Sequence, residues 1–366
     1  MGSKGDTTAP PELELEERFA APPRQGEAAG ELTLCFTGDN LLGSRMTALI
    51  AKHGEAWPYQ LVAEPLRAAD LAFGNLECPI TDYAHSTPGK PLATVRAGKN
   101  FIFKAPPQVS SRILADTGYD IVSLANNHAM DYCAEGLLDT LAELDAAKLA
   151  HAGAGRDAGQ AAQGVVLESG GWRVGYLAYT LIVPPSSRAG KDSAGVNTLA
   201  KQFQPALAAA IGELRQRADI VVVSLHWGQE GSRHPAAYQR EIAHRTIEAG
   251  ADIVAGHHPH CLQGVELCQG GVIAYSLGNF LFTGKSSRIE SFILRVKIDG
   301  AAADAGEQRR CHISRVELLP VWVRGGRPEP SQDSALLRSI SDVCASVGTR
   351  VVQDNGLLVV EADAAQ

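Results

Sequence analysis

The chain has 366 residues, of which 45% are hydrophobic and 20% are charged. This is the composition of a globular protein, and the length allows one large domain or two ordinary ones. The 33 basic and 41 acidic side chains leave a net charge of −8. The basic residues form no cluster interleaved with aromatics, which argues against nucleic acid as a partner.

The sequence carries no signal for membrane insertion or for thiol chemistry. No apolar run approaches the ~20 residues that a helix needs to cross a bilayer, and the start of the chain lacks an apolar signal core. We therefore expect a cytoplasmic protein without a membrane anchor. The seven cysteines are scattered and never form a C-x-x-C pair, so we expect neither a disulfide framework nor a thiolate zinc site. Most of them are expected to be small buried residues.

The first part of the chain is predicted to be a tail, followed by alternating strands and helices. Residues 1–30 are rich in Pro, Glu and Ala, so we expect a flexible tail with at most a short helix at Leu13–Phe19. Beyond it, short apolar runs alternate with amphipathic helices, which predicts a mainly parallel, layered α/β sheet. The predicted strands cover 32–36, 71–73, 119–124, 220–225 and 251–255, and the predicted helices 106–116, 137–144, 205–217 and 235–249.

Later segments alternate apolar and polar residues with few helices between them, which indicates antiparallel strands in a second sheet. Beyond them we predict a helix at Ser334–Val347 and a final edge strand at Leu357–Val360. The chain thus divides into a tail (1–30), a main α/β domain (31–325) and a C-terminal helix and edge strand packed on that domain (326–366). The alternating segments are Trp172–Thr180, Val265–Tyr275, Ser291–Ile298 and His312–Leu319.

Polar side chains follow each of the five predicted parallel strands. Ligands collect at the carboxyl ends of strands in open α/β sheets, so these side chains are candidates for one site. Taken alone, an Asp or Asn after a strand is more often a turn or capping residue, and the prediction depends on their coincidence. The candidates are Asp39 after the first strand, Asn75 and Glu77 after the second, Asn127, His128 and Asp131 after the third, His226 after the fourth, and His257, His258 and His260 after the fifth.

Oxygen and imidazole groups of this kind bind hard or borderline divalent ions, and the set could hold one six-coordinate ion. The choice among Ca, Mn, Mg and Zn, and between one ion and two, stays open. The run Gly256-His-His-Pro-His260 is the most specific signal, because three close imidazoles repel one another when protonated and contribute little packing. His151, in a glycine-rich run, is a further candidate to line the cleft. The predicted ligands are Asp39, Glu77, Asn127, His226, His258 and His260.

The predicted strand ends carry the motifs Thr37-Gly-Asp-Asn-Leu-Leu-Gly43, Asn75-Leu-Glu77, Ser123-Leu-Ala-Asn-Asn-His-Ala-Met-Asp131, His151-Ala-Gly-Ala-Gly155, His226-Trp-Gly228, Gly256-His-His-Pro-His260 and Tyr275-Ser-Leu-Gly-Asn-Phe280. Together these motifs resemble the CapA (poly-γ-glutamate biosynthesis) family of the calcineurin-like metallophosphoesterase superfamily. The resemblance implies a calcineurin-like four-layer α/β sandwich, with two central β-sheets flanked by helices. Asn127-His128 and His226 match the superfamily pattern, but Asp39 lacks the usual partner His, and Glu77 stands where a second Asp is usual. These departures argue against a bridged two-metal centre, and which imidazoles of the last run bind stays open.

Some relatives of this family without an anchor accompany ribosomal-peptide pathways, including an epimerase of a lasso peptide. Our leading hypothesis is therefore a metal-dependent peptide epimerase that inverts an α-carbon with two His/Asp pairs. The alternatives are a metallohydrolase or transferase acting on poly-γ-glutamate or a related amide, a phosphoesterase, and a non-catalytic binder of an acidic polymer. The candidate catalytic groups are His128, paired with Asp131 or Asp39, and His257 or His260 of the last run.

Substrate recognition is the least specified feature of the sequence. We expect a peptide or polyglutamate-like substrate, and the loops 82–104 and 183–192 are candidates to cover the cleft. Two basic residues of the first loop could meet a substrate carboxylate, although solvated surface charge is the simpler explanation for them. The candidate substrate-binding residues are Asn75, Trp227, Arg96, Lys99 and Asn279.

Overall fold

The computed structural model describes residues 30–90, 92–97, 101–284, 288–300 and 311–361. The predicted tail and its short helix at Leu13–Phe19 lie outside these residues, except for Gly30. That residue is fixed by the fold, because its carbonyl accepts a hydrogen bond of 3.0 Å from Nε1 of Trp172.

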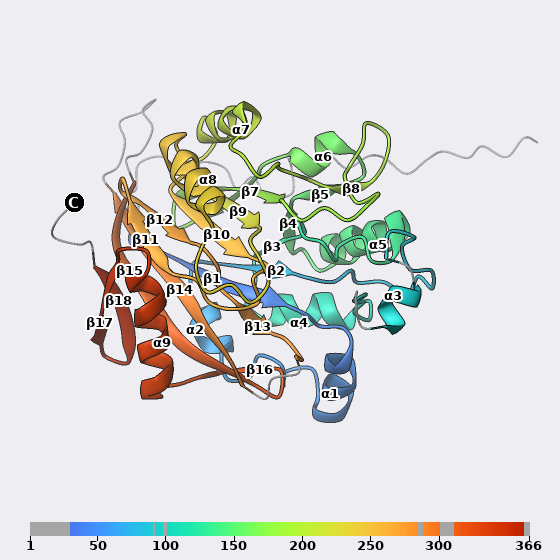
Figure 1. Cartoon of the computed structure of the whole chain (residues 1–366), viewed down its shortest axis with the longest axis horizontal. Coiled ribbons are helices and arrows are strands. Elements are labelled where there is room, and N and C mark those ends of the chain that lie inside the picture. Colours follow the sequence, from blue (N-terminus) through green and yellow to red (C-terminus); the bar gives the residue numbers. More distant parts are fainter. Residues whose placement is uncertain (1–29, 91, 98–100, 285–287, 301–310, 362–366) are drawn as a thin grey trace, which may run out of the picture.

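Two large sheets form the centre of the molecule (Figure 1). The first has the order β17-β18-β15-β14-β1-β2-β3-β4, with β13 added beside β1 and β16 beside β15. Its strands are β1 (Leu32–Asn40), β2 (Leu71–Leu76), β3 (Ile121–Ser123), β4 (Ala150–Ala152), β13 (Asn279–Leu281), β14 (Arg288–Gly300), β15 (Cys311–Arg324), β16 (Arg327–Pro330), β17 (Arg350–Asp354) and β18 (Leu357–Glu361).

The second sheet has the order β11-β12-β10-β9-β7-β6. A short separate pair, β5 (Ala154–Gly155) and β8 (Gly195–Val196), lies beside α6 (Ala158–Ala162). The strands of the second sheet are β6 (Val165–Ser169), β7 (Trp172–Thr180), β9 (Ile220–His226), β10 (Ile253–His257), β11 (Val265–Cys268) and β12 (Gly271–Ala274).

The two sheets pack face to face through apolar side chains that alternate along their strands. Phe73 of the first sheet stacks on Tyr176 of the second, with ring centroids 5.8 Å apart. This central core continues to the helix α9 (Ser334–Ala345), which closes one end of the sandwich through Leu336 and Ile340. Burial of this shared apolar surface is the main stabilisation of the sandwich.

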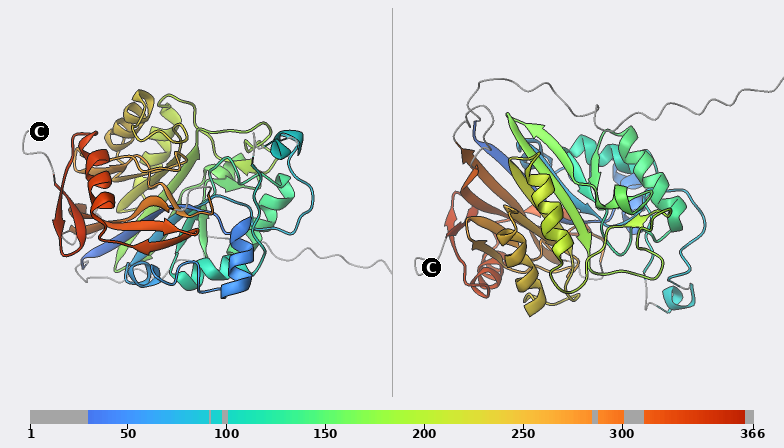
Figure 2. Two further views of the ribbon diagram at one scale, coloured as in Figure 1. Left: turned by 60° about the horizontal axis from the view of Figure 1, so that its bottom comes forward. Right: turned by 90° about the horizontal axis from the view of Figure 1, so that it is seen from above.

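Helices cover the outer faces of both sheets (Figure 2). Leu137 and Leu141 of α5 pack on the outer face of the first sheet, and Leu207 and Ile211 of α7 pack on that of the second. The result is a four-layer α/β sandwich, and the predicted fold class is confirmed. The helices are α1 (Arg45–His53), α2 (Ala63–Arg67), α4 (Val109–Thr117) and α5 (Cys133–Ala146) on the first sheet, α7 (Pro205–Arg215) and α8 (Ala237–Glu248) on the second, and α3 (Leu92–Arg96) in the loop after β2.

Three expectations about the sheets were wrong. β14 and β15 extend the first sheet beside β1, and β7 lies parallel to β9, so the later segments do not form a separate antiparallel sheet. Val265–Tyr275 is a hairpin and not one strand, because Gln269 and Gly270 have positive φ and turn the chain. The final strand β18 is internal, since β17 pairs with it and forms the edge.

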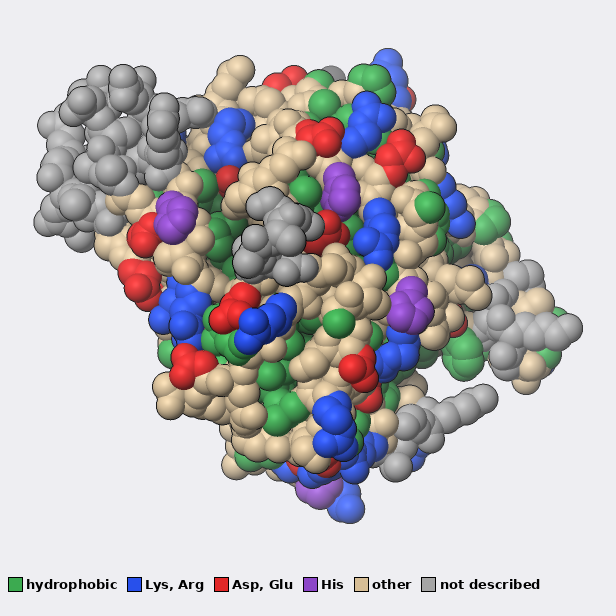
Figure 3. Space-filling model, turned by 60° about the vertical axis from the view of Figure 1, so that its left-hand side comes forward, with side chains coloured by type: hydrophobic (Ala, Val, Ile, Leu, Met, Phe, Trp, Pro, Cys, Tyr) green, Lys and Arg blue, Asp and Glu red, His purple; other side chains and the backbone are tan. Residues whose placement is uncertain are grey.

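The face of the molecule in Figure 3 carries no large patch of a single charge among the described residues. The face that carries α9 and the β17–β18 hairpin has acidic and basic side chains interspersed (Figure 3). No helix in the described ranges is long and apolar enough to cross a membrane. The expected cytoplasmic location stays a prediction.

Candidate functional site

The ends of the central strands bring the predicted polar residues together. In the first sheet, Asp39 is in register with Asn75 on one side and with Asn279 on the other. In the second sheet, His226 is in register with His257. A register shift in β1 just before Asp39 breaks the strand alternation at this point. Because the two sheets face each other, these residues form one buried polar group at the same edge of the sandwich.

The potential metal donors within this group are close to one another. One donor atom each of Glu77, His258 and His260 lies within 4.8 Å of the others. Nε2 of His226 lies 3.7 Å from Oε1 of Glu77, and Nε2 of His260 lies 3.8 Å from the same oxygen. The amide oxygen of Asn127 lies 2.7 Å from Nε2 of His226.

Several of these atoms are buried without a hydrogen-bond partner. Within the part of the chain that the structure describes, both carboxylate oxygens of Glu77, both ring nitrogens of His257 and Nδ1 of His258 have none. A buried polar atom without a partner costs free energy, so natural proteins nearly always satisfy such atoms. A divalent ion bound by Glu77 and the imidazoles would satisfy the carboxylate, and the oxygen and nitrogen donors fit a hard or borderline ion. The residues present therefore fit the predicted metal.

Asp39 lies at the centre of the group and holds the imidazoles in place. Its Oδ1 accepts a hydrogen bond of 2.8 Å from Nδ2 of Asn75, and its Oδ2 lies 3.3 Å from Nδ1 of His260. Burial alone would raise the pKa of the Asp39 carboxyl, but contacts with His257 and His260 hold it well below its usual range. Asp39 is thus an anion that orients the ring of His260, whose Nε2 then faces Glu77.

Burial and mutual charge shift the other groups in opposite directions. Burial, and then the charge of Asp39, raise the pKa of Glu77 well above its usual range. Burial and the neighbouring imidazoles lower the pKa of His226 well below its usual range, and that of His258 to about 4. For His260, burial would lower the pKa, but Glu77 and Asp39 raise it to about 10. Strongly shifted groups gathered in one place are typical of functional sites.

The loop after β10 has an unusual backbone. His258 and His260 have φ values of 96° and 57°, in the left-handed region that favours glycine. Such strain costs free energy and persists where the surroundings fix it, commonly at binding and active sites. The strained loop turns both imidazoles toward Glu77.

A second group of polar residues adjoins the metal donors. Nδ1 of His128 lies 2.7 Å from Oδ2 of Asp131, and Lys90 places its Nζ 2.5 Å from the other oxygen of that carboxylate. An ionised carboxylate only accepts hydrogen bonds, so Nδ1 of His128 carries the proton and Nε2 keeps a free lone pair. Burial lowers the pKa of His128, so the imidazole is neutral at neutral pH. A neutral imidazole held by a carboxylate is a suitable proton acceptor.

Two residues of the site were missed in the sequence. Lys90 comes from the loop between β2 and α3 and is buried against Asp131. Asn126 accepts hydrogen bonds at Oδ1 from the backbone N–H groups of His128 and Ala129, and donates from Nδ2 to Asn75. The Asn126-Asn127 pair was visible in the sequence, but only Asn127 was assigned a role. Lys90 carried no local signal.

Aromatic side chains contact the imidazoles of both polar groups. The ring of Phe103 lies 4.5 Å from that of His128, and Phe282 lies 5.1 Å from His260. Phe103 also stacks on Phe101, whose side chain is 54% exposed. The loop that carries Phe101 and Phe103 belongs to the segment 82–104 that we expected to cover the cleft.

The predicted substrate-binding residues have different environments. Asn75 and Asn279 lie in the site, where Asn279 accepts a hydrogen bond of 2.9 Å at Oδ1 from Nδ1 of His260. Trp227 is fully buried in the outer core, and its indole N–H bonds to the carbonyl of Tyr275, which leaves it a packing role. Arg96 is exposed at the end of α3, and Lys99 lies outside the described residues.

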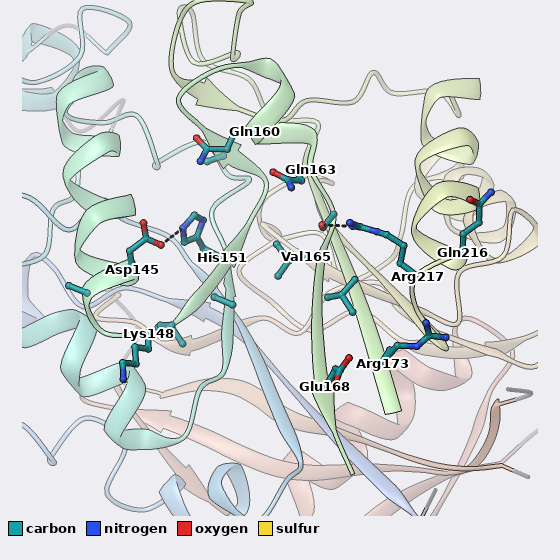
Figure 4. Close-up of a pocket in the computed structure, with 16 residues that line it drawn as sticks. Asp145, Lys148, His151, Gln160, Gln163, Val165, Glu168, Arg173, Gln216 and Arg217 are labelled. Atoms are coloured by element: carbon teal, nitrogen blue, oxygen red, sulfur yellow. Dashed lines mark hydrogen bonds and ion pairs between the residues drawn. The ribbon is translucent and has the colours of Figure 1, made fainter. Parts of the chain in front are cut away.

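A separate cavity of about 960 Å³ lies between α5, β6 and the end of α7 (Figure 4). His151 lines this cavity and turns toward Asp145, with 3.4 Å between Nε2 and Oδ1. Arg217 reaches from the far side to the carbonyl of Gly164. The expectation that His151 lines the cleft of the metal donors is therefore wrong, because β4 places it at the edge of the first sheet.

Comparison with known proteins gives a consistent set of relatives. The family model "Bacterial capsule synthesis protein PGA_cap" matches residues 33–284. The PGA biosynthesis protein CapA of Bacillus subtilis (strain 168) is 31% identical over 83% of this chain and 75% of its own length. The capsule biosynthesis protein CapA of Bacillus anthracis is 29% identical, over 82% of this chain and 69% of its length. A probable polyglutamine synthesis accessory protein of Mycobacterium tuberculosis (strain ATCC 25618 / H37Rv) is 28% identical, over 84% and 82%.

Proposed function

Since the chain belongs to the bacterial capsule synthesis protein (PGA_cap) family, we propose that it acts on the amide bonds of a polyglutamate-like acidic polymer. The reaction would be a metal-assisted hydrolysis or transfer. The names of its relatives, which refer to PGA, capsule and polyglutamine synthesis, support this substrate class. This was the alternative to a peptide epimerase in the sequence analysis.

The observation that carries the proposal is the carboxylate of Glu77, which lies buried beside three imidazoles and has no hydrogen-bond partner for either oxygen among the described residues. We assign Glu77, Asn127, His226, His258 and His260 as the groups that hold the ion. The bound ion would act as a Lewis acid toward an amide carbonyl. Asp39 would not need to bind it, because its oxygens already contact Asn75 and His260.

The chain's own residues would bind the polymer and move one proton. His128 is neutral, and its Nε2 is available to accept a proton while Asp131 stabilises the resulting imidazolium. Lys201 is exposed and close enough to His258 to affect its pKa. Lys201 is therefore a candidate partner for a carboxylate of the polymer, as is Arg96 on α3.

The test is the chain length of poly-γ-glutamate incubated with the protein and Mn²⁺, followed by size-exclusion chromatography with light scattering. We expect shortening that chelator abolishes and that Glu77→Gln and His128→Gln abolish. The control Glu290→Gln changes a carboxylate that pairs with Arg233 outside the site, and it should keep the activity. Polymer of unchanged length under all conditions would overturn the proposal.

A second candidate, epimerisation of a peptide α-carbon, is favoured by a different observation. Two His–carboxylate pairs, His128–Asp131 and His260–Asp39, lie in the same site. The exposed Phe101 and its partner Phe103, which contacts His128, would suit an apolar peptide side chain better than a polyanion. Two proton carriers are what inversion of an α-carbon requires.

The two candidates give different products. If the protein epimerises a peptide, incubation in heavy water should place deuterium at one α-carbon and invert that centre, and Asp131→Asn should abolish both changes. Phe101→Ser should weaken peptide turnover and leave polymer shortening unchanged. A peptide panel that shows no mass change would exclude this candidate.

A further inference from the structure

A second group of side chains that could bind a metal lies at the β11 edge of the second sheet, opposite the β6 edge. There α8 packs beside the β11–β12 hairpin. His244 comes from α8, and Glu266 and Cys268 are two residues apart on β11. Val265 and Leu267 face the central core, so strand alternation turns Glu266 and Cys268 to the outer face, where Cys268 packs near the helices. The three side chains therefore meet on the helix-covered side of an edge strand.

The distances between the donors are those of a compact site. Nε2 of His244 lies 2.9 Å from Oε1 of Glu266. One donor atom of each of the three residues, including the thiol sulfur, lies within 4.8 Å of the others. The side chain of His244 is 38% exposed and that of Glu266 is 12% exposed, so the group is accessible from solvent.

A neighbouring hydroxyl fixes the carboxylate. The OH of Tyr275 donates a hydrogen bond of 2.8 Å to Oε2 of Glu266, which leaves Oε1 directed at His244. Glu248 adds a further negative charge near Cys268. Such an outer partner is typical of metal-binding carboxylates, and the local negative charge favours a cation.

We propose that His244, Glu266 and Cys268 bind one divalent ion of the zinc class, at a site separate from the Glu77 group. A thiolate, an imidazole and a carboxylate are all zinc donors, and three protein ligands leave a fourth position for water. On binding, the S–H bond breaks, the sulfur–metal bond forms and the proton passes to solvent. The ion would link α8 to the edge strand β11.

A simple His–Glu ion pair explains only part of the arrangement. It accounts for His244 and Glu266, but it needs no thiol beside both donor atoms. Cys261 provides the contrast, because its thiol bonds to the carbonyl of Ser232 and belongs to no donor group among the described residues. No thiolate site could be predicted from the sequence, since Cys268 has no C-x-x-C partner and His244 lies 22 residues from Glu266.

The experiment uses Co²⁺ as a spectroscopic probe on the full chain, with the cysteines kept reduced by a phosphine. Bound thiolate gives a near-ultraviolet sulfur-to-cobalt charge-transfer band, which the oxygen and nitrogen donors around Glu77 cannot produce. We expect one charge-transfer band, whose intensity should saturate at a value that corresponds to one thiolate-bound cobalt ion per chain. Addition of Zn²⁺ should abolish this band. Zn²⁺ should also protect Cys268 from alkylation, as measured by peptide mass spectrometry.

Matched variants locate the band. Cys268→Ser should abolish the band. His244→Asn should weaken cobalt binding at this site by at least about tenfold, because replacing even a residue that only hydrogen-bonds to a metal ligand costs that much affinity. Cys261→Ser and Glu77→Gln should retain the band with wild-type intensity. Circular dichroism of each variant checks that it is folded.

Either of two results would overturn the proposal. One is a folded wild-type chain that shows no charge-transfer band with excess Co²⁺. The other is a band that persists in Cys268→Ser or disappears in Cys261→Ser, which would assign the thiolate to another place. Neither result depends on the proposed activity at the Glu77 group.

Discussion

Lys90 and Asp131 form a buried ion pair, with 2.5 Å between Nζ and Oδ1 and side chains 9% and 0% exposed. The same ammonium donates to the backbone carbonyl of Asn127. It therefore connects the loop after β2 to both groups of the site, since Asn127 adjoins the metal donors and Asp131 holds His128. A loop that contributes a buried charge in this way is part of the site and not only a cover over it.

We expect Lys90→Met to destabilise the protein by about 3 kcal/mol, because it leaves the Asp131 carboxylate buried with less compensation. The measurement is urea unfolding, in which the midpoint should fall while the slope stays constant. As a control, Arg112→Met removes the exposed pair with Glu55, whose side chains are 53% and 45% exposed. The midpoint of the control should hardly change. Equal effects of the two substitutions would contradict this account.

Glu77→Gln should change metal affinity and stability in opposite directions. The substitution removes a charged donor, so the affinity for Mn²⁺ should fall by about 100-fold or more. In the metal-free protein it removes a buried carboxyl whose pKa is raised well above its usual range. Because this pKa is higher in the folded than in the unfolded chain, the folded state loses stability as the pH rises above the pKa of the carboxyl in the unfolded chain. The Gln variant has no such carboxyl and avoids this loss. We therefore expect a higher melting temperature for metal-free Glu77→Gln at neutral pH.

The control for this prediction is Glu290→Gln, which alters a carboxylate paired with Arg233 at 2.5 Å outside the site. Its metal affinity should equal that of the wild type, and its stability should not increase. Isothermal titration calorimetry and thermal unfolding of chelator-treated protein give the two readouts. A Glu77→Gln variant that loses both affinity and stability would show that the carboxylate contributes to the metal-free fold.

Metal affinity should rise with pH. Burial would lower the pKa of His260, but Glu77 and Asp39 raise it to about 10, so the Glu77–His260 pair holds a proton in the metal-free chain at neutral pH. An ion that binds Nε2 must displace this proton, and each displaced proton makes the affinity rise by about tenfold per pH unit below that pKa. Competition with a chromophoric chelator between about pH 6.5 and pH 8.5 measures the slope. A flat profile would show that His260 is not a ligand.

The strand ends could be predicted from the sequence because each apolar run stops at a polar loop, and parallel strands carry their carboxyl ends to a common edge. Asp39, Glu77, Asn127 and His226 were found in this way. The choice among His257, His258 and His260 could not be made, since it depends on the positive φ values of His258 and His260 and on the orientation that Asp39 gives to one ring.

Other features depended on contacts far apart in the sequence. Lys90 meets Asp131 across 41 positions in a loop without periodicity, and nothing near it indicated a buried ammonium. The alternation of apolar and polar residues along β14 and β15 predicted strands correctly. It could not predict which sheet these strands would join, because the pattern shows that one face of a strand is buried but does not identify the neighbouring strand. The Gln269-Gly270 turn was missed for a similar reason, since it lacks the Asn-Gly or Asp-Gly signal of a tight hairpin.

Gly38→Ala tests the close approach that positions Asp39. A Cβ at Gly38 would lie 1.9 Å from the carbonyl oxygen of Gly278, which also accepts the hydrogen bond from the N–H of Asp39. Neither backbone segment can move without separating Asp39 from Asn279, so we expect a loss of about 3 kcal/mol or more in stability and weaker Mn²⁺ binding.

The control Gly212→Ala lies on an exposed turn of α7 with open space around it, and it should stabilise the protein by about 0.5–1 kcal/mol. Urea unfolding of both variants and metal titration of the folded fraction measure these effects. Gly38→Ala with wild-type stability and affinity would mean that Asp39 does not depend on this contact.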